Sequence, residues 1–286
     1  MNTAELLARE SFVELPARAR VECLLDAGTM RELVGPFERQ TSPWLPKQDI
    51  VTQADDGVII ARGTIDGVDV VVAAIEPAFQ GGSMGEVGGA KIAGALELAA
   101  EDAAAGKPVV PVLLLETGGV RLQEANCGLA AIAEIHAAIV ALRALVPVIG
   151  VITGPVGCFG GMSIAAGLCS HLIVTREARL GLNGPQVIEQ EAGVEEFDSR
   201  DRPMIWSLLG GAQRAATGLA DERTDDDRAR IRARIAAAVA AGPTRLARTA
   251  DVAAWDRLLE AIDPAERAEA GVVREVFARH LGGRHE

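Results

Sequence analysis

The middle of the chain alternates between short apolar runs and longer segments whose apolar residues recur with helical spacing. The apolar runs cover residues 109–116, 146–152 and 171–175, and the helical patterns cover 121–145 and about 161–168. Strands that alternate with helices predict an α/β fold. Because the apolar runs lack a clean inside/outside alternation, we expect a sheet that is covered on both faces.

The segments before this region predict a helical start followed by a hairpin. Residues 14–35 indicate a short amphipathic helix, a turn at Asp26–Gly28 and a second helical piece. Residues 57–76 alternate and are interrupted by Asp66–Gly67, which is typical of a tight turn between antiparallel strands. Residues 79–106 predict a glycine-rich entry into an alanine-rich helix.

The character of the chain changes at residue 221, where charged amphipathic helical patterns begin. Asp225, Asp226 and Asp227 stand where acidic residues favour the start of a helix. We therefore expect a core over residues 1–220, with an N-terminal helical segment, and a helical extension over 221–286 packed on that core. The charged helical faces are typical of solvated surfaces, and binding of a partner is the alternative.

Composition and charge narrow the possible functions. Apolar residues make up 49% of the 286 residues but aromatic residues only 3%, so the core must be built from Ala, Val, Leu and Ile. The net charge of −12 disfavours a nucleic-acid-binding protein. The N-terminus lacks the apolar segment of a signal peptide, and no run of 18 apolar residues could span a membrane. A cytoplasmic protein is expected.

Cysteine usage argues against a metal or disulfide framework. No C-x-x-C pair occurs among the four cysteines, which are Cys23, Cys127, Cys158 and Cys169. A zinc ribbon and a set of disulfides are both disfavoured by this spacing.

Two glycine-rich hinges follow apolar runs and precede helical patterns: "ETGGVRLQEA" at 116–125 and "GPVGCFGGM" at 154–162. A strand that ends in Gly-Gly and starts a helix can point several free N–H groups at one anion. The glycine-rich segment before Lys91 fits neither a P-loop nor a dinucleotide fingerprint. The hinges therefore favour an oxyanion hole, with Gly118, Gly119, Gly160 and Gly161 as candidate donors. Tight helix–sheet packing is the structural alternative.

The order and wording of these motifs resemble the carboxyltransferase branch of the crotonase superfamily. The resemblance rests on "FQGGSMGEVGGAKI", "ETGGVRLQEA" and the stretch from "VPVIGVITGPVGCFGGM" to "GLNGPQVIEQ", and it covers about residues 17–221. Within this branch, the hinges depart from those of acetyl-CoA carboxylase β subunits, and no zinc ribbon is possible. The two hinges are instead similar to those of the β subunits of biotin-independent malonate decarboxylases.

The resemblance implies a crotonase-like (ClpP/crotonase) spiral of ββα units and a carbon–carbon lyase. In that family the substrate is malonyl-S-acyl carrier protein, which is decarboxylated to acetyl-S-acyl carrier protein and CO₂. The carrier has a CoA-derived prosthetic group, and neither biotin nor a metal is expected. The implied partners are a homologous γ subunit, the acyl carrier protein subunit and an α transferase subunit.

The resemblance also implies contacts with the substrate around the hinges, and several have a plainer alternative. Lys91 could meet a phosphate of the pantetheine arm or remain solvated, and Cys158 could lie near substrate or only pack. Arg121 and Glu124 could orient the substrate or contact the partner. His136 could protonate the enolate, but its helical position favours a core histidine. The candidate substrate-binding residues are Gly82, Ser83, Gly85, Lys91, Arg121, Cys158, Asn183 and Gly184.

Two other functions compete with a decarboxylase. A carboxyltransferase β subunit of a biotin-dependent carboxylase would use the same oxyanion holes in the opposite direction. A non-catalytic scaffold would only bind a catalytic homologue or the carrier protein, and it would have no need of two hinges.

Overall fold

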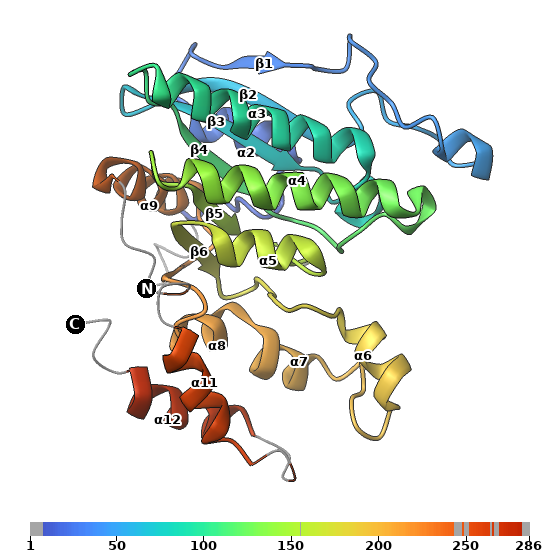
Figure 1. Ribbon diagram of the computed structural model, residues 1–286, viewed down its shortest axis with the longest axis vertical. Helices are drawn as coiled ribbons and strands as arrows, with labels where there is room; N and C mark the ends of the chain where they lie inside the picture. Colours follow the sequence, from blue (N-terminus) through green and yellow to red (C-terminus); the bar gives the residue numbers. More distant parts are fainter. Residues whose placement is uncertain are drawn as a thin grey trace.

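A seven-stranded mixed sheet forms the centre of the molecule. The computed structural model describes residues 8–154, 156–242, 248, 252–263, 265 and 269–281. The strands lie side by side in the order β1-β2-β3-β4-β5-β6-β7, which is also their order in the sequence (Figure 1). Helices cover both faces of the sheet, so the predicted α/β fold is confirmed.

The first three strands are antiparallel. β1 (Arg31–Leu33) pairs with β2 (Val58–Ile65), which pairs with β3 (Val68–Ile75). Asp66 and Gly67 turn this hairpin with φ of 50° and 80°, as the Asp-Gly pair predicted. The second helical piece expected before residue 35 is wrong, because residues 31–33 form the edge strand β1. Three residues are too short to carry a period that would have shown this strand in the sequence.

The remaining strands run parallel to β3. They are β4 (Val110–Leu114), β5 (Ile149–Ile152), β6 (His171–Thr175) and β7 (Glu222–Thr224). Parallel neighbours end at the same edge of the sheet, so the turns after β4 and β5 are neighbours. Both glycine-rich hinges therefore come to one edge.

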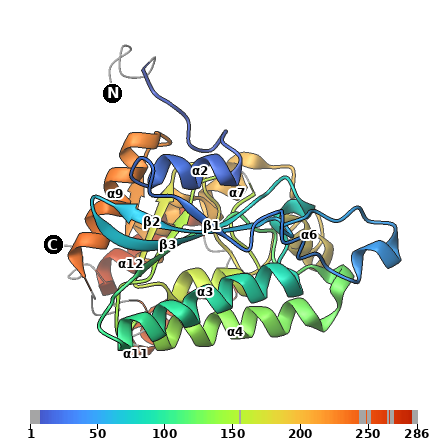
Figure 2. The same cartoon turned by 90° about the horizontal axis from the view of Figure 1, so that it is seen from above.

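Two layers of helices sandwich the sheet (Figure 2). One face carries α3 (Glu86–Ala104), α4 (Asn126–Leu142) and α5 (Gly161–Leu168), and the other carries α2 (Ala17–Leu24) and α9 (Arg228–Ala241). Successive residues of β2 serve the two cores: Ile60 belongs to the core on the side of α3, α4 and α5, and Ile59 to the core on the side of α2 and α9. Double coverage explains why the strands lack a polar face.

Helix α4 begins later than its pattern predicts. A short 3₁₀ turn at Leu122–Glu124 and Ala125, with φ of 50°, come between the first hinge and the helix. The apolar period runs on through this turn, which is why the sequence placed the helix start at 121.

The described residues form several more helical segments. The other helical segments are the 3₁₀ turns Leu45–Gln48 and Gln80–Gly82, and helices α6 (Pro185–Ala192), α7 (Arg202–Leu209), α8 (Gly211–Ala216), α11 (Val252–Glu260) and α12 (Ala270–Leu281). The Asp227 side chain caps α9 by accepting from the Arg230 amide, as the acidic cluster predicted. α11 and α12 pack on each other through an edge-on contact of Trp255 and Phe277.

The predicted division at residue 220 stays a prediction. β7 and α9 follow this position and belong to the sheet and to its cover. Residues 1–7 and 282–286, at the outer limits of the two predicted domains, lie outside the described residues. Within the described part of the chain, no helix is both long enough and apolar enough to cross a membrane.

Candidate active site

The two glycine hinges touch each other at the carboxyl edge of the sheet. The Thr117 amide donates to Gly157 O at 2.7 Å, and the Phe159 amide donates to Thr117 O at 3.1 Å. Gly119 and Gly160 have positive φ, 114° and 61°, and a Cβ on Gly160 would lie only 3.1 Å from Gly119 Cα. Only glycine allows this contact, so the sequence pattern reports a place where two backbones meet.

Three of the four predicted oxyanion donors already have partners. The Gly118 amide donates to Gly81 O at 3.0 Å, the Gly119 amide to Thr117 Oγ1 at 3.1 Å, and the Gly160 amide to Leu182 O at 2.7 Å. These amides hold the hinges in shape instead of facing a ligand. The prediction is therefore narrowed to the fourth residue, Gly161, and to amides that the sequence did not single out.

Each hinge carries a free amide next to its glycine pair, Val120 in the first and Gly161 in the second. Among the described residues, neither amide donates a hydrogen bond. Gly161 is the first residue of α5, where the helix dipole adds partial positive charge. The Val120 nitrogen lies 3.6 Å from the Cβ position of Gly160, so it borders the second hinge. Two unpaired donors at one edge can stabilise an oxyanion.

The glycine-rich segment 81–85 packs against the first hinge. A Cβ on Gly82 would lie 2.0 Å from Glu116 O, and a Cβ on Gly85 would lie 2.6 Å from Arg121 Nη1. Ser83 O accepts from Arg121 Nη2 at 3.0 Å. The three predicted residues of this segment thus support the first hinge, and their contact with a substrate stays a prediction.

Arg121 belongs to a buried ionic cluster, which we call the first carboxylate cluster: Asp56, Arg121 and Glu124. Arg121 Nη1 lies 2.8 Å from Asp56 Oδ1 and 2.8 Å from Glu124 Oε1, and the Arg121 side chain is 2% exposed. Burial raises the pKa of Asp56, and the guanidinium opposes that rise. With its charge paired inside the chain, Arg121 could meet substrate only if this cluster opened.

The same two carboxylates cap helix α3. Glu124 Oε2 accepts from the Glu86 amide at 2.6 Å, and Asp56 Oδ2 accepts from the Gly88 amide at 2.8 Å. Negative charge at these free amides is favourable because the helix dipole is positive there. The cluster therefore fixes α3 to the first hinge.

Lys91 and Cys158 have structural partners. Lys91 Nζ donates to Asp55 O at 2.9 Å and to Val58 O, and burial lowers the pKa of its amine. It lines a cavity of about 500 Å³ between α3 and the β1–β2 edge. Cys158 is fully buried, and burial raises the pKa of its thiol well above the usual value. The predicted substrate contacts of both residues stay untested.

The loop after β6 closes the second hinge from the other side. Leu182 O takes the Gly160 amide, and the exposed Asn183 follows, with its Nδ2 at 3.5 Å from Glu191 Oε2. Gly184 is the residue that precedes α6. The roles of Asn183 and Gly184 in shaping this loop and in contacting substrate stay predictions.

His136 reaches the second hinge from α4. Its Nε2 lies 2.7 Å from Gly161 O. A carbonyl can only accept, so Nε2 carries the proton and donates it to the backbone of α5. This arrangement supports the expected packing role of His136 over that of a proton donor.

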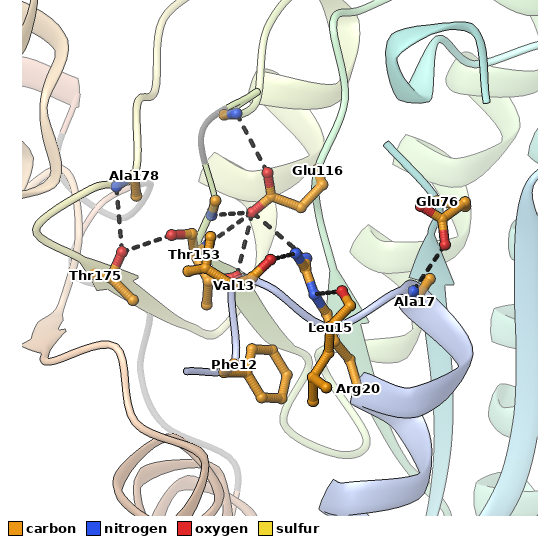
Figure 3. Close-up of polar contacts among 12 residues, drawn as sticks. Phe12, Val13, Leu15, Ala17, Arg20, Glu76, Glu116, Thr153, Thr175 and Ala178 are labelled. Atoms are coloured by element: carbon orange, nitrogen blue, oxygen red, sulfur yellow. Dashed lines mark hydrogen bonds and ion pairs between the residues drawn. The ribbon is translucent and has the colours of Figure 1, made fainter. Parts of the chain in front are cut away.

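The residue that sequence reasoning missed is Glu116, the first residue of the first hinge. Its side chain is 1% exposed and accepts from the amides of Thr153 at 2.9 Å, Gly154, and Gly157 at 3.4 Å (Figure 3). Arg20 from α2 lies 3.9 Å away. The available signal was a single acidic residue that closes the apolar run "VVPVLLLE".

The described residues hold no group of three or more His, Cys, Asp or Glu side chains that could bind a metal ion. What the hinges offer instead is hydrogen-bond donors to an anionic oxygen.

Comparison with known proteins gives the chain close relatives. It matches the model of the carboxyl transferase domain family over residues 14–284. It is 41% identical over 222 residues to the malonyl-S-ACP:biotin-protein carboxyltransferase MADC of Malonomonas rubra, which covers 74% of this chain and 70% of that protein.

Two solved structures are also similar. A chain of a Pseudomonas malonate decarboxylase hetero-tetramer in complex with malonate is 62% identical, with a TM-score of 0.92 over 96% of this chain and 100% of that chain. A chain of a Pseudomonas malonate decarboxylase MdcD-MdcE hetero-dimer is 56% identical, with a TM-score of 0.75 over 89% and 98% of the two chains.

Proposed function

The chain belongs to the carboxyl transferase domain family, with its crotonase-like α/β fold, and we propose that it is the β subunit of a malonate decarboxylase. It acts as a carbon–carbon lyase on malonyl-S-acyl carrier protein. The observation that carries this proposal is the meeting of two glycine hinges that leave the amides of Val120 and Gly161 free at one edge. The 62% identity to a malonate decarboxylase chain supports the choice of substrate.

The chemistry needs little more than these donors. When CO₂ leaves a malonyl thioester, the electron pair of the broken C–C bond moves into the thioester and leaves an enolate. Its oxygen carries charge that the ground state lacks, so hydrogen bonds to it lower the barrier. The amides of Val120 and Gly161 donate to this oxygen, and the dipole of α5 adds to the attraction. Removing one such donor typically costs about 10² to 10³ in rate.

The enolate carbon then takes a proton. Because His136 Nε2–H already donates to Gly161 O, this proton comes from water or from a residue of the partner subunit. Acetyl-S-acyl carrier protein and CO₂ leave.

The subunit works in a heteromer. Related malonate decarboxylase structures are a hetero-dimer and a hetero-tetramer, which supports a homologous γ subunit as its partner. The acyl carrier protein and an α transferase subunit complete the cycle in the cytoplasm. The substrate arrives on the CoA-derived group of the carrier, and this subunit uses neither biotin nor a metal.

The alternative is a carboxyltransferase that passes the carboxyl group to biotin. The Malonomonas rubra relative, a malonyl-S-ACP:biotin-protein carboxyltransferase, gives this reading a specific basis. Its 41% identity over 74% of the chain is lower than the 62% over 96% found with the malonate decarboxylase chain. Both readings share the malonyl thioester, and they differ in where the CO₂ goes.

The deciding experiment measures CO₂ release from malonyl-carrier by the complex isolated from native cells through this chain, with and without excess avidin. Release that ignores avidin is the expected result. Release that avidin abolishes would move the chain to the biotin-dependent carboxyltransferases. An active complex that keeps its turnover with Gly161→Val would contradict the oxyanion assignment and favour a scaffold.

A further inference from the structure

A buried carboxylate connects the two hinges. Glu116 ends the strand side of the first hinge, and the residues whose amides it binds, Thr153, Gly154 and Gly157, lie at the start of the second (Figure 3). One oxygen accepts from the amides of Thr153 and Gly154 and from Thr153 Oγ1 at 3.3 Å, and the other accepts from Gly157. One side chain of the first hinge thus holds the backbone that delivers Gly161.

The opposite side of this carboxylate is closed by an arginine from the N-terminal helix. Arg20 Nε donates to Leu15 O at 2.9 Å and its Nη2 to Val13 O at 2.6 Å, while Nη1 lies 3.9 Å from Glu116 Oε1. The two side chains are 2% and 1% exposed. The guanidinium is thereby fixed by backbone carbonyls and presents its charge to Glu116 without a direct hydrogen bond.

The hydrogen-bond donors around Glu116 favour its ionised form. Three backbone amides, which can only donate, and the Thr153 hydroxyl lie within hydrogen-bond distance of its oxygens. Burial raises the pKa of Glu116, and Arg20 and the three amides oppose that rise. The other ionisable groups that interact with it are Arg179, whose positive charge it favours, and the Cys158 thiol, whose negative charge it disfavours.

We propose that Glu116 is a positioning residue that sets the separation between the free amides of Val120 and Gly161. This inference rests on the proposed function, because the separation matters only if the two amides share one developing oxyanion. Glu116 does not touch the substrate. It acts by fixing Thr153, Gly154 and Gly157, and through them the start of α5, to the strand that ends in the first hinge.

A misplaced donor affects the transition state more than the bound substrate, because the enolate charge exists only after the C–C bond begins to break. Displacement of a catalytic group by about 1 Å can cost about 100-fold in rate. Disturbing Glu116 should therefore lower kcat and leave KM nearly unchanged.

The test uses Glu116→Gln in the assembled complex, with CO₂ release from malonyl-carrier as the assay. Glutamine keeps the size but turns an amide NH₂ toward donors, so the loop must shift. We expect kcat to fall about 10- to 100-fold, with KM within about twofold of the unaltered complex. An unchanged kcat, or a change confined to KM, would overturn the proposal.

The matched control is Asp226→Asn. Asp226 holds residues 11–13, which overlap at Val13 with the residues that Arg20 binds, through Ser11 Oγ at 2.6 Å, the Phe12 amide at 2.8 Å and the Val13 amide at 3.0 Å. It touches neither Glu116 nor the hinges. Its variant should keep the unaltered kcat, and a fall as large as that of Glu116→Gln would show that general loosening, not positioning, is responsible.

Hydrogen exchange of the complex, followed by mass spectrometry, separates this inference from the proposed function. Glu116→Gln should speed exchange in peptides that cover residues 153–163, and Asp226→Asn only in those that cover 10–15. Unchanged exchange at 153–163 in Glu116→Gln would overturn the proposal even if activity fell. If the unaltered complex released no CO₂, the proposed function would fail, and the exchange result would still decide whether Glu116 holds the second hinge.

Discussion

Each glycine hinge rests on buried carboxylates, but the negative charges are compensated in different ways. In the first carboxylate cluster, Asp56 and Glu124 both lie 2.8 Å from the Arg121 guanidinium. Under the second hinge, Glu116 is held mainly by backbone amides, and its cation, Arg20, stands 3.9 Å away.

This difference separates two tasks. A direct ionic contact with a shared guanidinium binds side chains to each other, so the first cluster fixes α3 to the first hinge. Backbone donors bind a side chain to the path of the chain, so Glu116 fixes a loop. Loss of the cation should therefore break the first arrangement and only weaken the second.

The largest effect is expected from Arg121→Met. This change leaves two carboxylates buried without their cation, and breaking a buried ion pair in this way typically costs about 3–5 kcal/mol of stability. Chemical denaturation gives the free energy of unfolding directly. A loss below about 1 kcal/mol would mean that the α3 amides alone stabilise the charges of Asp56 and Glu124. The first carboxylate cluster would then not differ from the arrangement around Glu116.

Arg20→Met should cost less, about 2–3 kcal/mol, since Glu116 keeps its amide donors. Its signature is the dependence on pH. The pKa of the Glu116 carboxyl is raised on folding from an ordinary value of 4.5, so the native protein binds this proton more tightly than the unfolded chain does. Stability therefore falls as the pH rises from the unfolded pKa to the folded pKa. Losing Arg20 raises this pKa further.

The stability gap between Arg20→Met and the unaltered chain should accordingly widen as the pH rises above the ordinary carboxyl pKa of 4.5. Activity should rise with pH instead, because the ionised carboxylate accepts from the Thr153 and Gly154 amides more strongly than the protonated acid does. Denaturation curves and CO₂ release at several pH values check the two trends. A gap that stays constant with pH would show that Arg20 contributes packing and not charge.

A smaller effect tests how closely the second hinge is fitted. A Cβ on Gly161 would lie 2.8 Å from Ile132 Cγ2 of α4, so Gly161→Ala should push the start of α5 outward. We expect a stability loss of about 1–2 kcal/mol and a clear fall in kcat.

The control for this change lies in the same helix. A Cβ on Gly167 would meet nothing within 4 Å, so Gly167→Ala should gain about 0.5–1 kcal/mol through helix propensity. Thermal unfolding and turnover of the two variants, measured side by side, check the pair. Equal kcat values in both variants would argue against a role for the exact placement of α5.

The smallest expected effect is that the Cys158 thiol does not react in the native protein. Cys158 lies inside the second hinge with no exposed surface, and burial raises the pKa of its thiol. Iodoacetamide should leave it unlabelled in the native protein and label it after unfolding. Glu116→Gln should increase its labelling, and rapid labelling of the unaltered protein would show that the hinge opens without any mutation.

The contrast between the clusters also marks the limit of sequence reasoning. The hairpin at Asp66–Gly67, strand β4 and helix α5 were all predicted, because each depends on a local pattern of apolar and turn residues. The strands β1 and β7 were missed because three residues are too few to show a period. The family was predicted from the wording of the hinges, and the comparisons confirm it.

The sequence predicted where the site lies but not which of its groups are free to act. The glycine pairs located the two hinges, but which amide is free depends on carbonyls far along the chain, such as Leu182 O for Gly160. The Glu116–Arg20 pair joins residues 96 positions apart, and no local pattern links them. Arg121 was expected near substrate. Its pairing with Asp56, which lies 65 residues earlier, could not be read from the local sequence.

The contact of Phe12 with Asp226 spans 214 positions and has a consequence for the order in which the protein folds. Contacts this distant are slow to form, because a long stretch of chain must be closed into a loop first. During synthesis the sheet from β2 to β6 can assemble, with α2 packed on it, before residue 226 leaves the ribosome, whereas Ser11, Phe12 and Val13 lack their hydrogen bonds to Asp226 until then. We expect residues 11–13 to settle among the last steps, so that a nascent chain completes its sheet before it fixes the Val13 carbonyl that holds Arg20 beside Glu116.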